Sequence, residues 1–141
     1  MKQMLEQKRA AHALRLVRLP AAQNRDWARK MATHINKTPI RILNNGLGQA
    51  LAFLVADNGG ARGDRRKESG VLYDHLTEWL CGEPDEAHPR RIYPAGDLLE
   101  RLMEGDQAQY FRAQEEALAL FVWLRKFADA YLKTEEQEGA R

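Results

Sequence analysis

The sequence is poor in the residues that build disulfides, cysteine clusters and β-sheets. Cys81 is its single cysteine, which excludes an intrachain disulfide and a cysteine-cluster metal site. Valine and isoleucine together occur 8 times among 141 residues, against 20 alanines and 18 leucines, and this imbalance favours helices over a sheet. Because the length suits one core, we predict an all-α fold in a single helical domain over residues 1–141.

Long hydrophobic runs are also missing. No apolar stretch approaches the roughly 18 residues of a membrane span. Residues 1–6 lack the apolar core of a signal peptide. We therefore expect a soluble, cytoplasmic protein without a membrane partner.

Glycine-rich nucleotide-binding loops are absent as well. Gly46 and Gly48 lie close together, but neither a strand nor the lysine of a phosphate-binding loop accompanies them, and the third glycine of a dinucleotide fingerprint is missing. Cys81 has no evident base beside it, and the chain has no Gly-x-Ser-x-Gly elbow. We expect no cofactor.

The four histidines do not follow metal-binding spacing. His12, His34, His75 and His88 show neither a His-x3-His pattern nor a partnering cysteine pair. His75 and Glu78 lie three residues apart, but a di-metal site needs several more carboxylates, so we interpret them as a pair on a helix surface. The spacing therefore predicts no metal site.

The net charge of +2 conceals an uneven distribution along the chain. Residues 1–75 hold 14 Lys and Arg against 6 Asp and Glu, a balance of +8, whereas residues 76–141 hold 8 against 14, a balance of −6. The asymmetry fits a basic face for an anionic partner, and it equally fits solvated helix faces that happen to segregate.

Hydrophobic periodicity predicts a bundle of about six helices with a long C-terminal helix. Asn24 is an expected N-cap, Pro39 an expected first helical residue after Thr38, and Asp106 with Gln109 an expected capping box. A mobile basic loop at about 57–67 and a frayed tail at about 135–141 complete the prediction. The predicted helices are 2–18, 24–36, 38–56, 69–81, 97–104 and 106–133.

Residues 41–54 combine helical leucine spacing with two glycines and paired amides, which are costly inside a helix. On a helical wheel, Gly46 faces the core, where a missing side chain lets another helix approach. Asn45, Gly48 and Gln49 face outward as a polar stripe, which we interpret as a subunit contact, the alternative being a solvated face with a kink. Phe53 is expected in the core, as is Trp123.

Several segments match one known family in order. They are Leu-Glu-Gln-x-Arg-Ala at 5–10, Leu-Tyr-x3-Thr-x-Trp-Leu at 72–80, Asp-Leu-Leu at 97–99 and Tyr-x5-Glu-Ala-Leu-x4-Trp-Leu-x2-Phe-Ala at 110–128. The most specific is Asn-Gly-Leu-Gly-Gln-x-Leu-Ala-Phe-Leu at 45–54. Together they resemble the small subunit of the type III-B (Cmr) CRISPR effector complex.

This resemblance implies a small helical protein without catalytic activity of its own. It implies that copies of the chain stack into a short filament beside the crRNA-binding backbone subunit, where they line the groove that holds the crRNA–target RNA duplex. The implied partners are the other Cmr subunits, copies of the chain, crRNA and target RNA, and we expect a monomer in isolation. The resemblance assigns no function to the loop at 56–67.

A subunit of an RNA groove needs cations along one side, because phosphate contacts position a strand without reading its sequence. Eight basic residues within the first 45 positions are therefore candidate RNA contacts, and the acidic half is expected to face neighbouring subunits. The candidates are Lys8, Arg15, Arg18, Arg25, Arg29, Lys30, Lys37 and Arg41. Arg9, in contrast, projects among apolar positions and is expected to snorkel or to pair with a carboxylate.

One enzymatic pattern is also present. Arg29 and His34 form Arg-x4-His, as in metal-independent helical ribonucleases of the HEPN type, in which they would stabilise charge and transfer protons. Lys30 stands where that family has a small polar residue, and the motif is short. A ribonuclease using Arg29 and His34 is the alternative function.

Overall fold

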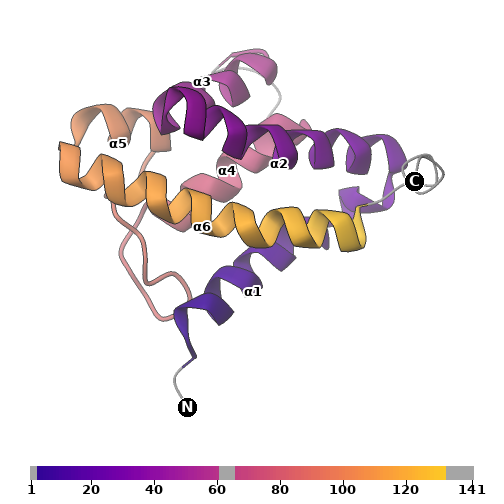
Figure 1. The fold of residues 1–141 in the computed structure, drawn as a ribbon, viewed down its shortest axis with the longest axis horizontal. Coiled ribbons are helices and arrows are strands. Elements are labelled where there is room, and N and C mark those ends of the chain that lie inside the picture. The colour runs from indigo at the N-terminus through magenta and orange to yellow at the C-terminus, as the bar shows by residue number, and fades with distance from the viewer. Residues whose placement is uncertain (1–2, 61–65, 133–141) are drawn as a thin grey trace.

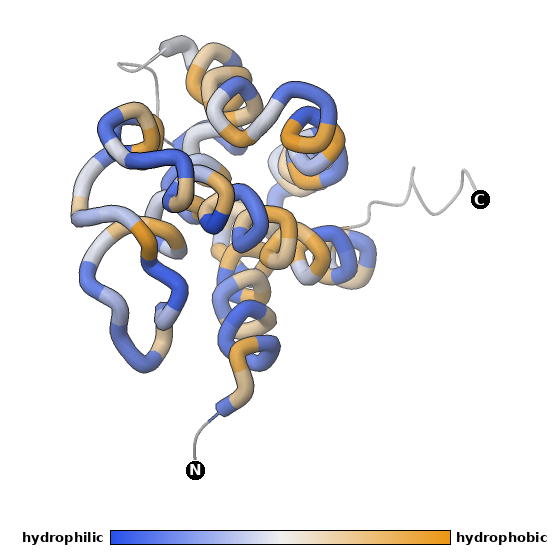
Figure 2. The backbone as a smooth tube through the Cα atoms, turned by 60° about the vertical axis from the view of Figure 1, so that its left-hand side comes forward, coloured by the Kyte–Doolittle hydropathy of each residue, from blue (hydrophilic) through white to orange (hydrophobic). Residues whose placement is uncertain are grey.

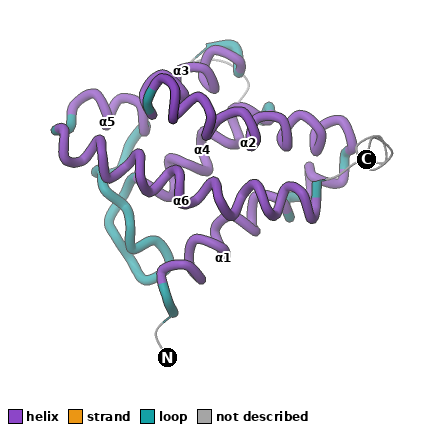
Figure 3. Tube along the Cα trace, in the orientation of Figure 1, coloured by secondary structure: helices purple, strands orange, loops and turns teal. Residues whose placement is uncertain are grey.

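The computed structural model describes residues 3–60 and 66–132. In these residues the chain forms six α-helices and one short 3-10 helix, and Figure 3 shows no strand among them. This confirms the all-α prediction. The elements are α1 (Leu5–Val17), the 3-10 helix η1 (Pro20–Gln23), α2 (Arg25–Asn45), α3 (Leu47–Asp57), α4 (Glu68–Leu80), α5 (Leu98–Glu104) and α6 (Gln107–Tyr131).

The long helix α6 lies along both α1 and α2 (Figure 1). Helices α2 and α6 run side by side in opposite directions, while α3 and α4 pack against α2. In Figure 2 hydrophobic and hydrophilic residues alternate around the helical turns, and the long loop between α4 and α5 is largely hydrophilic. Buried apolar residues from every α-helix meet in one cluster, which includes Leu16, Ile35, Leu51, Trp79 and Leu120.

A buried ion pair ties α1 to this core. Glu116 of α6 is only 5% exposed, and its two oxygens accept hydrogen bonds from Nε and Nη2 of Arg9 at 2.7 and 2.8 Å. The indole N–H of Trp79, on α4, donates to the same carboxylate at 3.1 Å. Arg9 also pairs with the exposed Glu6, and these carboxylates raise the pKa of its guanidinium. The expectation that Arg9 pairs with a carboxylate is confirmed.

The predicted helix boundary near Thr38 was wrong, because α2 continues through Pro39. A proline inside a helix removes one backbone hydrogen bond and costs about 3 kcal/mol. The apolar side of α2 remains buried on both sides of it, at Ile35 and Ile42, and this packing offsets the cost. The hydroxyl of Thr38 donates to the backbone carbonyl of His34 at 2.6 Å, so it does not act as an N-cap.

The helix break lies instead at Gly46, whose φ of 88° and ψ of 163° fall in a region that is essentially restricted to glycine. A Cβ atom there would lie 2.8 Å from the Tyr110 hydroxyl, so the space left by the missing side chain is used by a side chain of α6. Side chains of α6 replace a local cap for α3: the Leu47 N–H donates to Gln114 at 3.0 Å, and the Gly48 N–H to Tyr110 at 3.0 Å. The costly glycines thus create a sharp junction held by α6.

Two predicted helix N-termini were confirmed. Asp106 and Gln109 form the predicted capping box of α6, and Asn24 accepts a hydrogen bond as the N-cap of α2. The prediction that Phe53 lies in the core was wrong, because this residue is 46% exposed. Trp123 is half-buried and packs against the core. Residues 61–65 of the predicted mobile loop and the whole predicted tail lie outside the described residues. Among the helices described, none is both long enough and apolar enough to cross a lipid bilayer.

Candidate functional site

The outer face of α2 gathers most of the predicted RNA contacts. Five of its residues are cationic and only Asp26 is acidic, which gives the helix a balance of +4. At 100° per residue these cations fall within an arc of about 160°, opposite the buried arc that contains Met31 and Ile35. They extend over about 24 Å at 1.5 Å per residue. The five cations, called the α2 basic face below, are Arg25, Arg29, Lys30, Lys37 and Arg41.

Local contacts orient part of this face. Asp26 accepts a hydrogen bond from Arg29 at 2.7 Å and pairs with Lys30 at 3.1 Å; Lys30 first and then Arg29 hold the pKa of its carboxyl below the ordinary value. The guanidinium of Arg41 stacks over the ring of Phe53 at 4.4 Å, which explains why this phenylalanine is held at the surface. Asp26 therefore orients Arg29 and Lys30 on this face and offsets part of their positive charge.

The candidate cations of α1 are more dispersed. Lys8 is half-buried, and Arg18 lies 5.7 Å from the ring centroid of Tyr131. Arg15 is turned toward α4, where its guanidinium pairs with Glu78 at 3.0 Å. The structure thus brings together the candidates of α2 but not those of α1.

The predicted subunit-contact stripe is only partly at the surface. Asn45 and Gln49 are exposed on either side of the Gly46 break. Gly48 is half-buried beneath Leu102 and Tyr110, so its predicted outward position was wrong. The helical-wheel projection misplaced Gly48 because it assumed one continuous helix, whereas the helix breaks at Gly46. Large apolar side chains are exposed near the junction instead, namely Ile40, Leu43 and Phe53.

The two residues of the ribonuclease motif do not converge. Five positions along a helix separate Arg29 from His34 by about 140° of rotation. Arg29 pairs with Asp26, whereas the imidazole of His34 is half-buried and lies 3.2 Å from the carboxylate of Asp57. Burial lowers the pKa of His34. The structure therefore does not support a ribonuclease site in which Arg29 and His34 act on the same phosphate.

A cluster of histidines forms where α1, α4 and the loop after α4 meet. The rings of His12 and His75 stack with centroids 3.8 Å apart, and the ring of His88 meets His12 edge-on at 5.0 Å. Trp79 stacks on His12 from 5.0 Å. Arg15 lies beside His12 and donates a hydrogen bond to the carboxylate of Glu78. We call His12, His75, His88, Arg15 and Glu78 the histidine cluster.

These imidazoles are buried, and burial favours their neutral form. Desolvation lowers the pKa of His12 to about 4 and holds the pKa of His75 well below its usual range. It also lowers the pKa of His88, where the nearby Arg91 adds to the effect. The interpretation of His75 as a helix-surface residue was wrong, since it is buried.

Sequence spacing missed this cluster because its members come from three separate segments. One signal was present: at 100° per residue His12 falls on the same arc as Leu5 and Leu16, the apolar side of α1. A titratable residue on a buried arc requires a partner. Nothing in the sequence pointed to His88, which lies in the loop between α4 and α5.

Comparison with known families identifies the chain. A family model described as CRISPR-associated protein (Cas_Cmr5) matches residues 5–131. The match begins with the first residue of α1 and ends with the last residue of α6, so it includes every described helix. It confirms the resemblance to the small subunit of the type III-B complex. The chain belongs to the Cas_Cmr5 family and is a CRISPR-associated Cmr subunit.

Proposed function

We propose that the chain is a non-catalytic structural subunit that stacks with copies of itself beside the crRNA-binding backbone and helps to hold the crRNA–target RNA duplex. Family membership makes the other subunits of the Cmr effector complex its partners. The observation that carries the RNA part of the proposal is the α2 basic face, because it places four exposed cations and the half-buried Arg41 on one side of a single helix.

Such a face suits a duplex whose sequence has already been read by base pairing. Lysine and arginine attract phosphates through charge, release counterions and do not distinguish bases. An A-form duplex is recognised mainly by its shape and backbone. A row of cations along about 24 Å of helix can therefore follow a strand without selecting its sequence.

The stacking part of the proposal is supported by the junction between α2 and α3. Asn45 and Gln49 offer amide donors and acceptors there, and Leu43 is 72% exposed although it is a large apolar residue. Exposed apolar side chains rimmed by polar ones are typical of interaction surfaces. We place the contact between copies at this junction.

A charge-matched comparison in the assembled complex tests the RNA contact. The double variant Lys30→Gln/Lys37→Gln removes two cations from the α2 basic face, and Arg90→Gln/Arg125→Gln removes two exposed cations elsewhere. The first is expected to reduce the salt slope of target-RNA affinity by about 2 for each copy that contacts the duplex, and the second to leave it unchanged, since each phosphate contact contributes about 1. Equal slopes for the two doubles would refute the RNA contact.

Native mass spectrometry tests the stacking. Asn45→Arg/Gln49→Arg is expected to lower the number of copies per complex, and the isolated wild-type chain is expected to remain a monomer by light scattering. An unchanged copy number with both arginines present would place the contact elsewhere.

The non-catalytic part is tested with the isolated chain and labelled single-stranded RNA. We expect intact RNA on a denaturing gel, together with weak and strongly salt-dependent binding by anisotropy. Cleavage that is lost in His34→Ala would establish the alternative ribonuclease, and cleavage that persists in this variant would point to another catalytic residue.

A further inference from the structure

Three potential metal ligands converge inside the histidine cluster. They are a nitrogen of His12 from α1, a carboxylate oxygen of Glu78 from α4 and a nitrogen of His88 from the following loop, all within 4.8 Å of one another. Nδ1 of His12 and Nε2 of His88 are 3.3 Å apart, and Nε2 of His88 lies 3.7 Å from Oε1 of Glu78. The three belong to segments up to 76 positions apart, so the fold itself assembles the group.

The neighbours of the two histidines favour a proton on the nitrogen that is not part of this group, which leaves a lone pair on the other nitrogen. Nε2 of His12 lies 2.9 Å from the backbone carbonyl of His75, which can only accept, so that nitrogen carries the proton and Nδ1 is the unprotonated one. The carboxylate of Asp85 lies 3.6 Å from Nδ1 of His88, which favours the proton on that side and a lone pair on Nε2. Partners of this kind orient the histidines of metal sites.

Arg15 already places a positive charge between the three ligands. Its Nη2 lies 2.9 Å from Nδ1 of His12, 3.0 Å from Oε1 of Glu78 and 3.2 Å from Nε2 of His88. An NH2 group has two hydrogens for these three acceptors, so it does not satisfy them all. The side chain of Arg15 is 59% exposed and can rotate into solvent.

We propose that His12, Glu78 and His88 bind a divalent transition-metal ion of the Zn²⁺ class, and that the Arg15 guanidinium occupies its place in the metal-free chain. Two imidazoles and one carboxylate form a ligand set that Zn²⁺ prefers, with a fourth position left for water. Tetrahedral coordination with bonds of 2.0–2.1 Å separates ligand atoms by about 3.3–3.4 Å.

Little rearrangement is needed to reach that geometry. The separation of the two histidine nitrogens, 3.3 Å, already fits a tetrahedral edge. The 3.7 Å between His88 and Glu78 is longer, and Glu78 is the more mobile partner because half of its side chain is exposed. Glu78 must also approach His12, since its carboxylate oxygen lies within 4.8 Å of the His12 ligand nitrogen, and Arg15 must move away.

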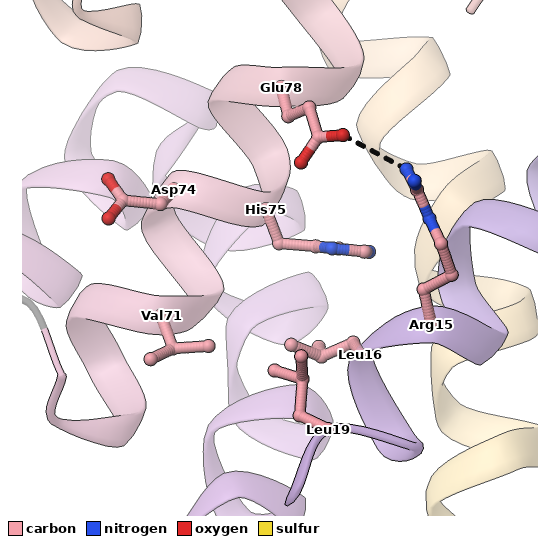
Figure 4. Close-up of a pocket in the computed structure, with 7 residues that line it drawn as sticks. All are labelled: Arg15, Leu16, Leu19, Val71, Asp74, His75 and Glu78. Atoms are coloured by element: carbon pink, nitrogen blue, oxygen red, sulfur yellow. Dashed lines mark hydrogen bonds and ion pairs between the residues drawn. The ribbon is translucent and has the colours of Figure 1, made fainter. Parts of the chain in front are cut away.

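A pocket of about 320 Å³ beside the cluster offers a path for the ion and its water. Arg15 from α1 and Glu78 from α4 face each other across it, joined by their ion pair, and His75 projects between them (Figure 4). His75 lines this pocket, and its Nε2 is buried without a hydrogen-bond partner among the described residues.

The metal would join α1, α4 and the loop after α4 at one point. The ligands are therefore structural, and binding is expected to raise the melting temperature of the chain, because the folded state alone presents all three together. This role does not depend on RNA contact or on stacking.

The test titrates the full chain, freed of metal by a chelator, with Co²⁺ and then Zn²⁺ at pH 7.5. We expect one Co²⁺ per chain with a tetrahedral visible absorption, quenching of the fluorescence of Trp79, which stacks on His12, and displacement of cobalt by Zn²⁺. Glu78→Gln and His88→Gln are expected to weaken binding at least about 10-fold. His34→Ala, a histidine outside the cluster, is the matched control and should bind as the wild type does.

Arg15→Ala separates a metal site from a merely structural cluster. If Arg15 occupies the metal position, its removal strengthens Zn²⁺ binding, whereas loss of a purely structural contact would not. Circular dichroism verifies that each variant is folded. The proposal is refuted if neither the wild type nor Arg15→Ala binds one metal per chain at micromolar concentration, or if the folded Glu78→Gln and His88→Gln bind as tightly as His34→Ala.

Discussion

The buried ion pair between Arg9 and Glu116 predicts a large and specific loss of stability. Glu116→Ala leaves the half-buried Arg9 guanidinium without its main counter-ion and the Trp79 indole N–H without an acceptor. Removing one partner of a buried pair typically costs about 3–5 kcal/mol. Because a domain of this size is stable by about 5–15 kcal/mol, this loss should be visible at once in a urea titration.

Two controls test the cause of that loss. Glu6→Ala removes the exposed partner of the same arginine and should cost less than about 1 kcal/mol. The double variant Arg9→Met/Glu116→Gln removes both charges but keeps an acceptor for Trp79, so it should be more stable than Glu116→Ala. A free energy of unfolding for Glu116→Ala within about 1 kcal/mol of the wild type would refute this account of the pair.

Further predictions concern the junction and the buried imidazoles. Gly46→Ala should destabilise the chain by more than Gly60→Ala in thermal melts: both glycines have positive φ, but only at Gly46 would the new Cβ meet Tyr110, so equal losses would contradict the close approach. In the metal-free chain, stability should be fully present above about pH 6.5 and fall as the pH is lowered toward 4, because the unfolded state binds more protons there. His12, with its pKa lowered to about 4, contributes about 3 kcal/mol of this loss and His75 adds to it, so a flat profile over that range would contradict the burial of neutral imidazoles.

Local signals allowed much of the fold to be predicted from sequence. Caps act within a few residues, so Asn24 and the Asp106–Gln109 box placed two helix starts correctly. The position of Pro39 inside α2 depends on burial along both halves of that helix, and the break at Gly46 depends on side chains of α6. Tertiary contacts therefore decided the boundaries that propensity misplaced.

The same distinction applies to the candidate sites. The α2 basic face follows from helical spacing along one segment, and its cations could be found in the sequence. The histidine cluster required knowledge of which helices pack together, since Arg15 reaches Glu78 across 63 positions and His12 meets His88 across 76. Phe53 was expected in the core because it is apolar, and its stacking with Arg41 was not predictable from spacing.

The central claim is that the α2 basic face lies against RNA in the assembled Cmr complex. The most direct measurement replaces Lys37 with a photo-reactive amino acid, assembles the complex with crRNA and labelled target RNA, and detects RNA attached to the chain after irradiation. The same replacement at Arg90, an exposed cation outside the face, is the control. The account predicts strong cross-linking from position 37 and little from position 90; cross-linking from position 90 alone would contradict it.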